Sequence, residues 1–258
     1  MKNFLEILLR DQTTGKHILW ANDEFGAKEI QPAQIDLIEP RWKKNRELQK
    51  LRTKTRAEIF TPPEVCELQN DLVCKPFDKR TPWRDFINAK FLEITCGEAP
   101  YLVNRYNAVT GDAIPLDNRV GLLDRKFHVV NSETKTQPGW MSSAIQALQS
   151  VYGYEFQGDN LFLARRNVFD TVKDFFRAKF NREPPEDFLI AVATIISCNL
   201  WQMDGLTGAI PYANTNRQGT LSFGNEPDKP QEDVYCKILD WQTRKLVEFK
   251  SLSKGGRR

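Results

Sequence analysis

Hydrophobic positions along the chain alternate between strand-like runs and helical spacing, which predicts an α/β fold. Runs of apolar and β-branched residues at 91–96 and 151–155 are typical of buried strands, and a third strand is expected at 195–200. Apolar residues at helical spacing mark three further segments: 141–151, 160–179 and 189–193, of which the last continues as a helix or runs into the third strand. Strands separated by helices predict an open sheet, in which ligands bind outside the carboxyl ends of the strands.

The pattern at the start of the chain predicts an irregular N-terminal arm. Residues 1–40 hold short apolar stretches broken by glycine and proline, which is typical of loops with two short strands. Residues 41–56 carry eight basic residues against the single acid Glu47, so they predict a basic helix or an extended segment. The chain is therefore divided into an arm at 1–55 and a domain at 56–258.

Turn and cap residues mark where the predicted elements of the domain begin and end. Thr61 is expected to cap a helix that has Pro62 in its first turn and apolar residues as far as Val73. Gly97 ends the first strand, and a helix is expected to follow it through 101–106. The remaining expectations are an insertion at about 107–140 with a short strand at 127–130, a polar loop at 207–233, and a two-stranded ribbon at 234–249.

Composition narrows the class of protein. The chain has 258 residues, 40% hydrophobic and 28% charged, which excludes collagen-like and wholly disordered chains. No apolar run approaches the roughly 20 residues of a membrane-spanning helix, and Glu6 and Arg10 interrupt the first apolar stretch. We therefore expect a cytoplasmic protein with no membrane partner. The formal net charge of +3 neither demands nor excludes a nucleic-acid partner.

Cysteine and histidine exclude several kinds of site. The five cysteines contain no C-x-x-C pair, so neither a disulfide framework nor a four-thiolate zinc site is indicated, and no metal is expected. The two histidines, His17 and His128, do not lie in a recognisable nucleophile elbow. A histidine-based hydrolase is set aside on these grounds.

Polar or small residues follow each predicted strand. Cys96-Gly97 after the first strand is a tight turn that lets the backbone approach a ligand, and the absence of G-x-G-x-x-G argues against a pyrophosphate site. The carboxylate of Glu155, at the end of the second strand, suits the two hydroxyls of a ribose. Asp204, which precedes Gly205 after the third strand, could accept the amine of an adenine. The three positions together indicate an adenosine ligand without a pyrophosphate.

Four segments resemble, in order, the amino-terminal half of adenine-specific (N6) DNA methyltransferases of restriction–modification systems. They are IFTPPE at 59–64, LEITCGEAPYL at 92–102, VYGYE at 151–155 followed by ARRN, and NLWQMDGL at 199–206. The resemblance implies a Rossmann-like sheet that binds S-adenosylmethionine, the methyl donor, without a metal. The cofactor-binding residues that it implies are Phe60, Thr61, Pro62, Glu93, Cys96, Gly97, Glu155, Asp204 and Gly205.

Within that resemblance, each segment has an expected role. The segment Phe60-Thr61-Pro62 would pack on the methionine part of the cofactor, Glu155 would hold the ribose, and Asp204 would face the adenine amine. The family's catalytic tetrapeptide, [ND]-P-P-[YF], does not occur in the sequence, and the nearest string, AIPY at 209–212, lacks its first two residues. The catalytic residues therefore remain unknown, and the catalytic strand and target-recognition region are not found.

Two classes of function follow. In the first class, we expect the modification subunit of a restriction–modification system, or its cofactor-binding half. It would transfer methyl groups to double-stranded DNA together with a second polypeptide that carries the catalytic motif. Alternatively, we expect a non-catalytic subunit that binds S-adenosylmethionine and DNA, or a truncated remnant that needs a partner chain. A cognate restriction endonuclease is a possible further partner of this family.

The basic run and the missing strand give two further expectations. The run is either a solvated face or a DNA-phosphate contact, for which the candidate residues are Arg41, Lys43, Lys44 and Arg46. A sheet that stops after its third strand would leave an edge unpaired and would expose apolar residues: Ile195, Ile196 and Leu200. We therefore expect the isolated chain to be marginally stable or to self-associate.

Overall fold

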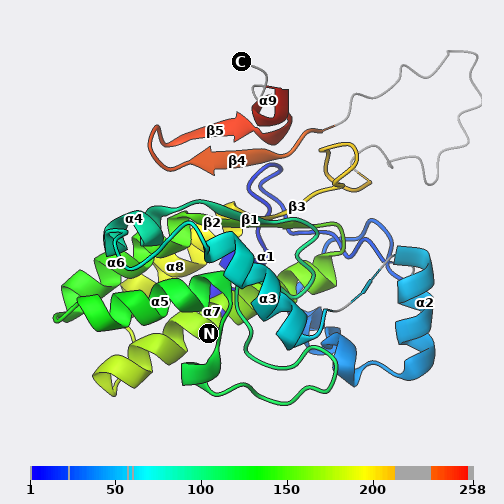
Figure 1. The fold of residues 1–258 in the computed structure, drawn as a ribbon. Coiled ribbons are helices and arrows are strands. Elements are labelled where there is room, and N and C mark those ends of the chain that lie inside the picture. Colours follow the sequence, from blue (N-terminus) through cyan, green and yellow to red (C-terminus); the bar gives the residue numbers. More distant parts are fainter. Residues whose placement is uncertain (1, 23, 57, 60, 213–233, 255–258) are drawn as a thin grey trace, which may run out of the picture.

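A three-stranded parallel sheet organises the protein, as described by a computed structural model (Figure 1). The structure describes residues 2–22, 24–56, 58–59, 61–212 and 234–254. Strands β1 (Phe91–Glu93), β2 (Val151–Glu155) and β3 (Leu200–Gln202) lie in the order β1-β2-β3. Phe91 is in register with Val151, and Gly153 with Leu200. The predicted α/β class is confirmed, and β2 has the predicted bounds.

Two α-helices connect each strand to the next, and the first connection also holds the 3-10 helix η3 (Leu116–Asn118). Between β1 and β2 lie α5 (Leu122–Glu133) and α6 (Gln137–Gln149), and between β2 and β3 lie α7 (Gly158–Phe180) and α8 (Glu186–Asn199). Local sequence fixes these helices: the hydroxyl of Thr136 caps α6 by accepting from Gly139 N, and α7 ends at Asn181, whose φ is 52°. Their buried aromatic residues form the centre of the main core: Phe127, Trp140, Phe175 and Phe176.

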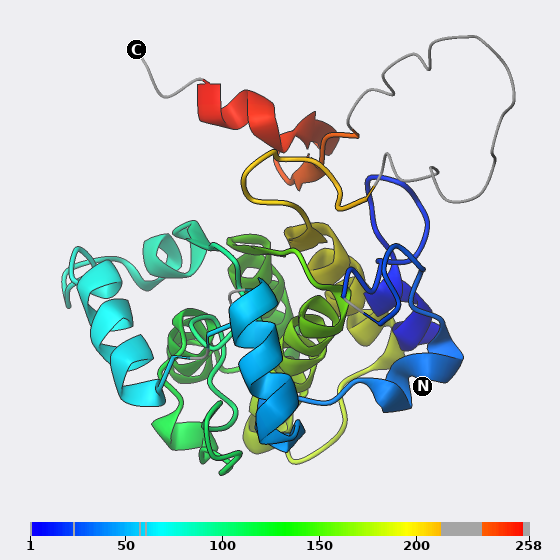
Figure 2. The same ribbon diagram turned by 90° about the vertical axis from the view of Figure 1, so that its right-hand side faces the viewer.

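The two faces of the sheet are covered differently. Val151 and Leu200 belong to the main core under the helices, whereas Tyr154 and Trp201 belong to a smaller apolar cluster. That cluster is closed by a ribbon of β4 (Lys237–Asp240) and β5 (Lys245–Glu248), which is antiparallel and is followed by α9 (Phe249–Lys254). Figures 1 and 2 show this unit above the sheet, with α5 and α7 below it. The predicted ribbon is confirmed.

The N-terminal arm packs into the main core. Residues predicted to be irregular form the helix α1 (Lys2–Leu9), which packs against α8 and α7 because its apolar residues, including Leu8 and Leu9, are buried there. The 3-10 helix η1 (Pro32–Leu37) follows a loop with isolated antiparallel bridges. The arm touches the start of α7: the amide of Gly158 donates to Trp20 O at 3.0 Å, and a Cβ at Gly158 would lie 1.9 Å from Leu19 O.

A buried arginine makes a second connection between the arm and the core. Arg165 on α7 donates to the carbonyls of Leu8 at 2.7 Å and Arg10 at 2.9 Å. The same guanidinium donates to Leu200 O at 2.6 Å and 2.8 Å and to Ser197 O at 3.3 Å. Because the side chain is fully buried, its N–H groups satisfy buried carbonyl oxygens that water cannot reach, and these carbonyls come from three parts of the chain.

Four further helices follow η1 and precede β1. They are η2 (Arg41–Lys43), α2 (Arg46–Arg56), α3 (Pro63–Cys74) and α4 (Trp83–Asn88). The predicted start of α3 is one residue too early. Pro63 disfavours the helical conformation in the residue before it, so Pro62 is extended, with ψ of 148°, and Thr61 does not cap the helix.

Three further element predictions are wrong. Residues 127–130 belong to α5, where Leu123, Phe127 and Val130 bury one face of a helix. Residues 195–199 are the end of α8, so the third strand begins only at Leu200. The first strand ends at Glu93, and turns rather than a helix follow it, since positive φ values interrupt the chain at 95, 97 and 99.

The apolar residues expected to be uncovered are buried instead. Ile195, Ile196 and Leu200 are at most 4% exposed, because α8 lies under α1 and β3 lies inside the core. Seven of the exposed large apolar residues lie near the other edge of the sheet, on or just after β1, on α3 and in the segment before α3: Ile59, Val65, Leu68, Leu72, Val73, Leu92 and Ile94. Others lie on α2, on α8 and in the C-terminal ribbon. Within the described residues, no helix is long and apolar enough to cross a membrane.

Candidate functional site

A cavity of about 590 Å³ opens at the carboxyl ends of β1 and β2. The turn after β1, the start of α7 and the inner side of α3 form its walls. Five residues singled out from the sequence line it: Thr61, Glu93, Cys96, Gly97 and Glu155. The structure thus brings residues that are up to 94 positions apart to one place, where open α/β sheets bind ligands (155 − 61 = 94).

The turn after β1 exposes its backbone to this cavity. Thr95, Gly97 and Ala99 all have positive φ, between 48° and 63°, and the amide of Cys96 donates to Tyr154 O at 2.8 Å. A Cβ at Gly97 would meet no atom within 4 Å, so the space above this glycine is open. The thiol of Cys96 is buried, and burial raises its pKa well above the usual range, so it is a small packing group rather than a nucleophile.

Glu155 joins the two strand ends. Its Oε2 accepts from the amide of Gly97 at 2.9 Å, and its Oε1 accepts from the amide of Gln157 at 3.1 Å. The side chain is buried, which raises the pKa of its carboxyl although both amides favour the charged form. Each carboxylate oxygen has two lone pairs, so the group can still accept from two hydroxyls of a ligand.

Glu93 supports the same turn from the end of β1. Its two oxygens accept from the backbone amides of Tyr101 at 3.2 Å and Leu102 at 3.1 Å. Burial raises the pKa of Glu93 to about 8, with a smaller contribution from the charge of Glu155. The side chain therefore shapes the loop and also places a titrating group in the wall of the cavity.

The charges around the cavity are of one sign. Four carboxylates line it, from Glu58, Glu93, Glu98 and Glu155, and no lysine or arginine of the described residues does. A wall of this kind repels the phosphates of a nucleotide and favours ligands that carry hydroxyls or a positive charge. The chemistry of the wall therefore agrees with the absence of a pyrophosphate motif in the sequence.

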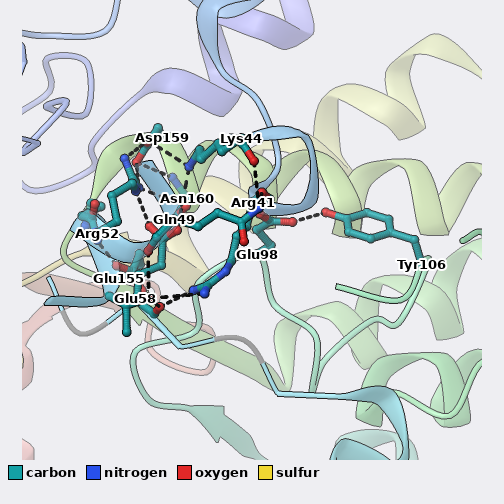
Figure 3. A network of polar contacts seen from close by, with 12 residues as sticks. Arg41, Lys44, Gln49, Arg52, Glu58, Glu98, Tyr106, Glu155, Asp159 and Asn160 are labelled. Atoms are coloured by element: carbon teal, nitrogen blue, oxygen red, sulfur yellow. Dashed lines mark hydrogen bonds and ion pairs between the residues drawn. The ribbon is translucent and has the colours of Figure 1, made fainter. Parts of the chain in front are cut away.

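A buried polar network fixes one wall of the cavity (Figure 3). The guanidinium of Arg52 on α2 binds Asp159 on α7 through two hydrogen bonds, at 2.8 Å and 3.1 Å, and its Nε donates to Glu58. Asn160 Nδ2 also donates to Glu58, at 3.1 Å. These contacts join α2 to the start of α7 and hold Glu58 in place. Sequence reasoning missed the network, because its members are about 100 positions apart.

The candidate DNA-binding residues lie in different environments. Lys44 is buried, with Nζ 3.7 Å from Asp159 and 4.0 Å from Glu58, so it is not a surface cation as expected. Arg41 is half-buried and donates to Glu58 O and to the hydroxyl of Thr53. Lys43 and Arg46 are exposed.

The other predicted cofactor residues lie away from the cavity or outside the described residues. Asp204 closes a turn, with its Oδ1 accepting from Leu206 N at 2.8 Å, and Gly205 lies against the ring of Tyr154; neither lines the cavity. Pro62 precedes α3 without lining the cavity, and Phe60 is outside the described residues.

The string AIPY lies in a loop near the cavity. Ala209 forms an isolated bridge with Tyr235, and the ring of Tyr212 lies 5.9 Å from that of Phe156, which lines the cavity.

Comparison with known proteins identifies no protein similar to this chain. A scan against protein-family models and searches of curated proteins and of solved structures found no match. In the part of the chain that the structure describes, no group of three or more histidine, cysteine, aspartate or glutamate side chains is arranged to hold a metal ion.

Proposed function

We propose that the chain is the S-adenosylmethionine-binding part of an adenine-specific DNA methyltransferase with a Rossmann-like sheet. The observation that carries the proposal is the hydrogen bond between Glu155 and the amide of Gly97 in the cavity at the strand ends. The strand-end acid and the glycine turn of the resembling segments are thus in direct contact. A wall with carboxylates and without lysine or arginine suits a ligand with a ribose, a sulfonium and an ammonium group.

The residues of this chain would bind and orient the methyl donor. Glu155 accepts from the ribose hydroxyls, the open backbone at Gly97 lets the ligand approach, and Thr61 lies beside the methionine part. The sulfonium of the bound cofactor supplies an already activated methyl group, so the remaining task is to position the nucleophile. No residue of the chain is assigned to the N6 amine of the target adenine in DNA, because [ND]-P-P-[YF] does not occur in the sequence.

A partner polypeptide would complete the enzyme. β1 is an edge strand, and in the resembling family the sheet continues beyond the first strand with the strand that carries the catalytic tetrapeptide. The free edge of β1 therefore supports a split enzyme, in which a second chain supplies that strand and the target-recognition region. The same absence of a catalytic tetrapeptide favours the second candidate function, a subunit that binds S-adenosylmethionine and DNA without methyl transfer.

Binding of S-adenosylmethionine to the purified chain tests the proposal. We expect heat of binding in a calorimetric titration, and a loss of about 1.5–3 kcal/mol in binding free energy for Glu155→Ala, which removes a charge-assisted acceptor. Glu183→Ala, at an exposed acid paired with Arg177, is the matched control and should bind as the wild type does. Absence of heat and of a thermal shift at millimolar cofactor would overturn the proposal.

Transfer of tritiated methyl groups to a DNA library separates the two candidate functions. The chain alone is expected to transfer none, and addition of a polypeptide with an Asn-Pro-Pro-Tyr strand from a neighbouring reading frame should restore transfer. Transfer by the chain alone would identify a catalytic segment within it, such as the loop at 209–212. Binding without transfer in either mixture would favour the non-catalytic subunit.

A further inference from the structure

The four carboxylates of the cavity divide into two pairs. Glu58 and Glu98 have cations beside them: Arg52 binds Glu58, and Lys44 lies 4.0 Å from Glu58 and also acts on Glu98. Glu93 and Glu155 have none, since neither forms an ion pair with a described residue. These two acids, at the ends of neighbouring strands, therefore form an inner pair without a cation.

The surroundings of the inner pair keep it free of positive charge. Glu93 faces the amides of Tyr101 and Leu102, the phenol of Tyr101, the thiols of Cys66 on α3 and Cys96, and Glu155 itself. The charged or titratable groups that face Glu155 are Glu93, Asp159 on α7, Cys96 and Tyr154.

Two carboxylates of this kind cannot both be charged at low cost. Burial and their mutual repulsion favour a state in which one carboxyl holds a proton, as the raised pKa of about 8 for Glu93 indicates. A ligand with a fixed positive charge favours loss of that proton, because its cation stabilises the charged form of both carboxyl groups.

We propose that Glu93 and Glu155 make the cavity selective for a cationic sulfonium nucleoside over its neutral thioether, and that the cation displaces a proton from the pair into solvent. This inference rests on the proposed S-adenosylmethionine site. It assigns Glu93 as a specificity-determining residue, in addition to its hydrogen bonds to the loop. After methyl transfer the ligand loses its sulfonium charge, so the pair would take up a proton and the product would bind less tightly.

Calorimetric titration in two buffers of different ionisation enthalpy measures the proton directly. For the wild-type chain at pH 7 we expect release of about half to one proton per S-adenosylmethionine bound, and release close to zero for S-adenosylhomocysteine. Affinity for S-adenosylmethionine should rise between pH 6 and pH 8, by up to about tenfold per pH unit, and should level off above pH 8. Both ligands carry the same amino and carboxyl groups, so their difference reports the sulfonium.

Two variants locate the effect. Glu93→Gln keeps an acceptor for one of the amides of Tyr101 and Leu102 but holds no titrating proton, so it should bind both ligands with similar affinity and with little pH dependence. Asp124→Asn alters a buried carboxyl outside the cavity, whose pKa burial raises to about 6, and should keep the wild-type behaviour.

The outcomes distinguish this inference from the proposed function. If neither ligand binds the wild-type chain, the cofactor site itself is wrong. If both ligands bind equally well, or release protons equally, the cofactor site stands and the role of the inner pair is overturned. Because this comparison uses the wild-type chain, it holds even if Glu93→Gln does not fold.

Discussion

Lys126 shows how one buried charge joins separate elements of this protein. The side chain has no exposed surface, and its Nζ donates to Ile87 O, Ala89 O and Ser150 Oγ at 3.2 Å, 2.5 Å and 2.5 Å. The ammonium also lies 4.5 Å from the ring centroid of Phe91. Through these contacts α5 holds the segments that lead into β1 and β2, so the sheet register depends on this residue.

Substitution of Lys126 should change both the stability and its pH dependence. Burial lowers the pKa of Lys126 to about 7, so between pH 7 and about 10.5 the unfolded chain binds more protons at this group, and Lys126 by itself makes stability rise with pH. Glu93 makes stability fall between about pH 4.5 and 8, and the five cysteines, whose pKa values burial raises, make it fall above about pH 8.5. The wild type and Lys126→Met share these opposing contributions, so urea unfolding of both chains at about pH 8, 9 and 10 should show a stability difference that grows with pH. Loss of the buried donor should itself cost on the order of 2–3 kcal/mol.

The exposed Lys50→Met serves as the control for that series and should keep the wild-type slope. A stability difference between the wild type and Lys126→Met that does not change with pH would contradict the assignment of a lowered pKa to Lys126.

At individual residues, part of the site could be predicted from the sequence, because acidic and glycine residues stand at the ends of the predicted strands. Glu155 and Gly97 were identified in this way, and they are in contact. Glu58 and Asp159 were not, since an acid that is buried only by packing against a distant segment leaves no local pattern. Lys44 was misjudged for the same reason: a lysine in a basic run looks exposed until its partners on α7 are known.

At the scale of elements, α2 has one face toward the protein and one toward solvent. Arg52 points into the buried network, whereas Arg46, Lys50 and Lys54 are exposed and recur every four residues, on one side of the helix. In Figure 1 this helix lies at one side of the molecule, apart from the helices of the main core. A regular basic stripe suits contacts with phosphates more than with base edges.

Charge reversal of this stripe should weaken binding to DNA without altering the fold. For Arg46→Glu/Lys50→Glu/Lys54→Glu we expect weaker affinity for any duplex sequence, and a log–log salt slope reduced by about 0.9 for each phosphate that the variant no longer neutralises. Reversal of two exposed charges elsewhere, Lys135→Glu/Arg182→Glu, is the control. Fluorescence anisotropy between about 50 mM and 200 mM salt measures both quantities; unchanged binding by the triple variant would mean that the stripe is only a solvated face.

Elements were predictable where the pattern was long or clearly bounded. The helix α7 and the strand β2 were both identified from the spacing of apolar residues. Residues 127–130 and 195–199 were misassigned as strands, because a short apolar run fits a buried helix as well as a buried strand. The packing of α5 and α8 decides between the two, and it is not visible in a short window of sequence.

At the scale of the whole molecule, part of the exposed apolar surface lies around the edge strand β1. Phe91 N donates to Ser150 O, so the alternation of a strand turns the backbone N–H and C=O of Leu92 to the edge where the described residues place no neighbouring strand. On α3, Val65, Leu68 and Leu72 form an exposed apolar stripe. An unpaired edge next to such a stripe invites association.

Polar substitution of the α3 stripe should reduce self-association. Leu68 and Leu72 are 63% and 64% exposed, so Leu68→Gln/Leu72→Gln should leave thermal stability within about 0.5 kcal/mol of the wild type. Sedimentation velocity over a range of concentrations should show less oligomer for this variant than for the wild type. Leu206→Gln, at a 98% exposed leucine far from α3 in sequence, should have no effect; a wild-type chain that stays monomeric throughout would contradict the prediction.

The contacts of the N-terminal arm also bear on how the chain is made. Leu8, Arg10 and Trp20 leave the ribosome early, but the groups that bind their carbonyls, Arg165 and the amide of Gly158, are synthesised about 140 or more residues later. At about 5–20 residues per second, that interval is on the order of 10 s. During it the apolar face of α1 has no α7 or α8 to cover it, so this face stays exposed until translation passes α8.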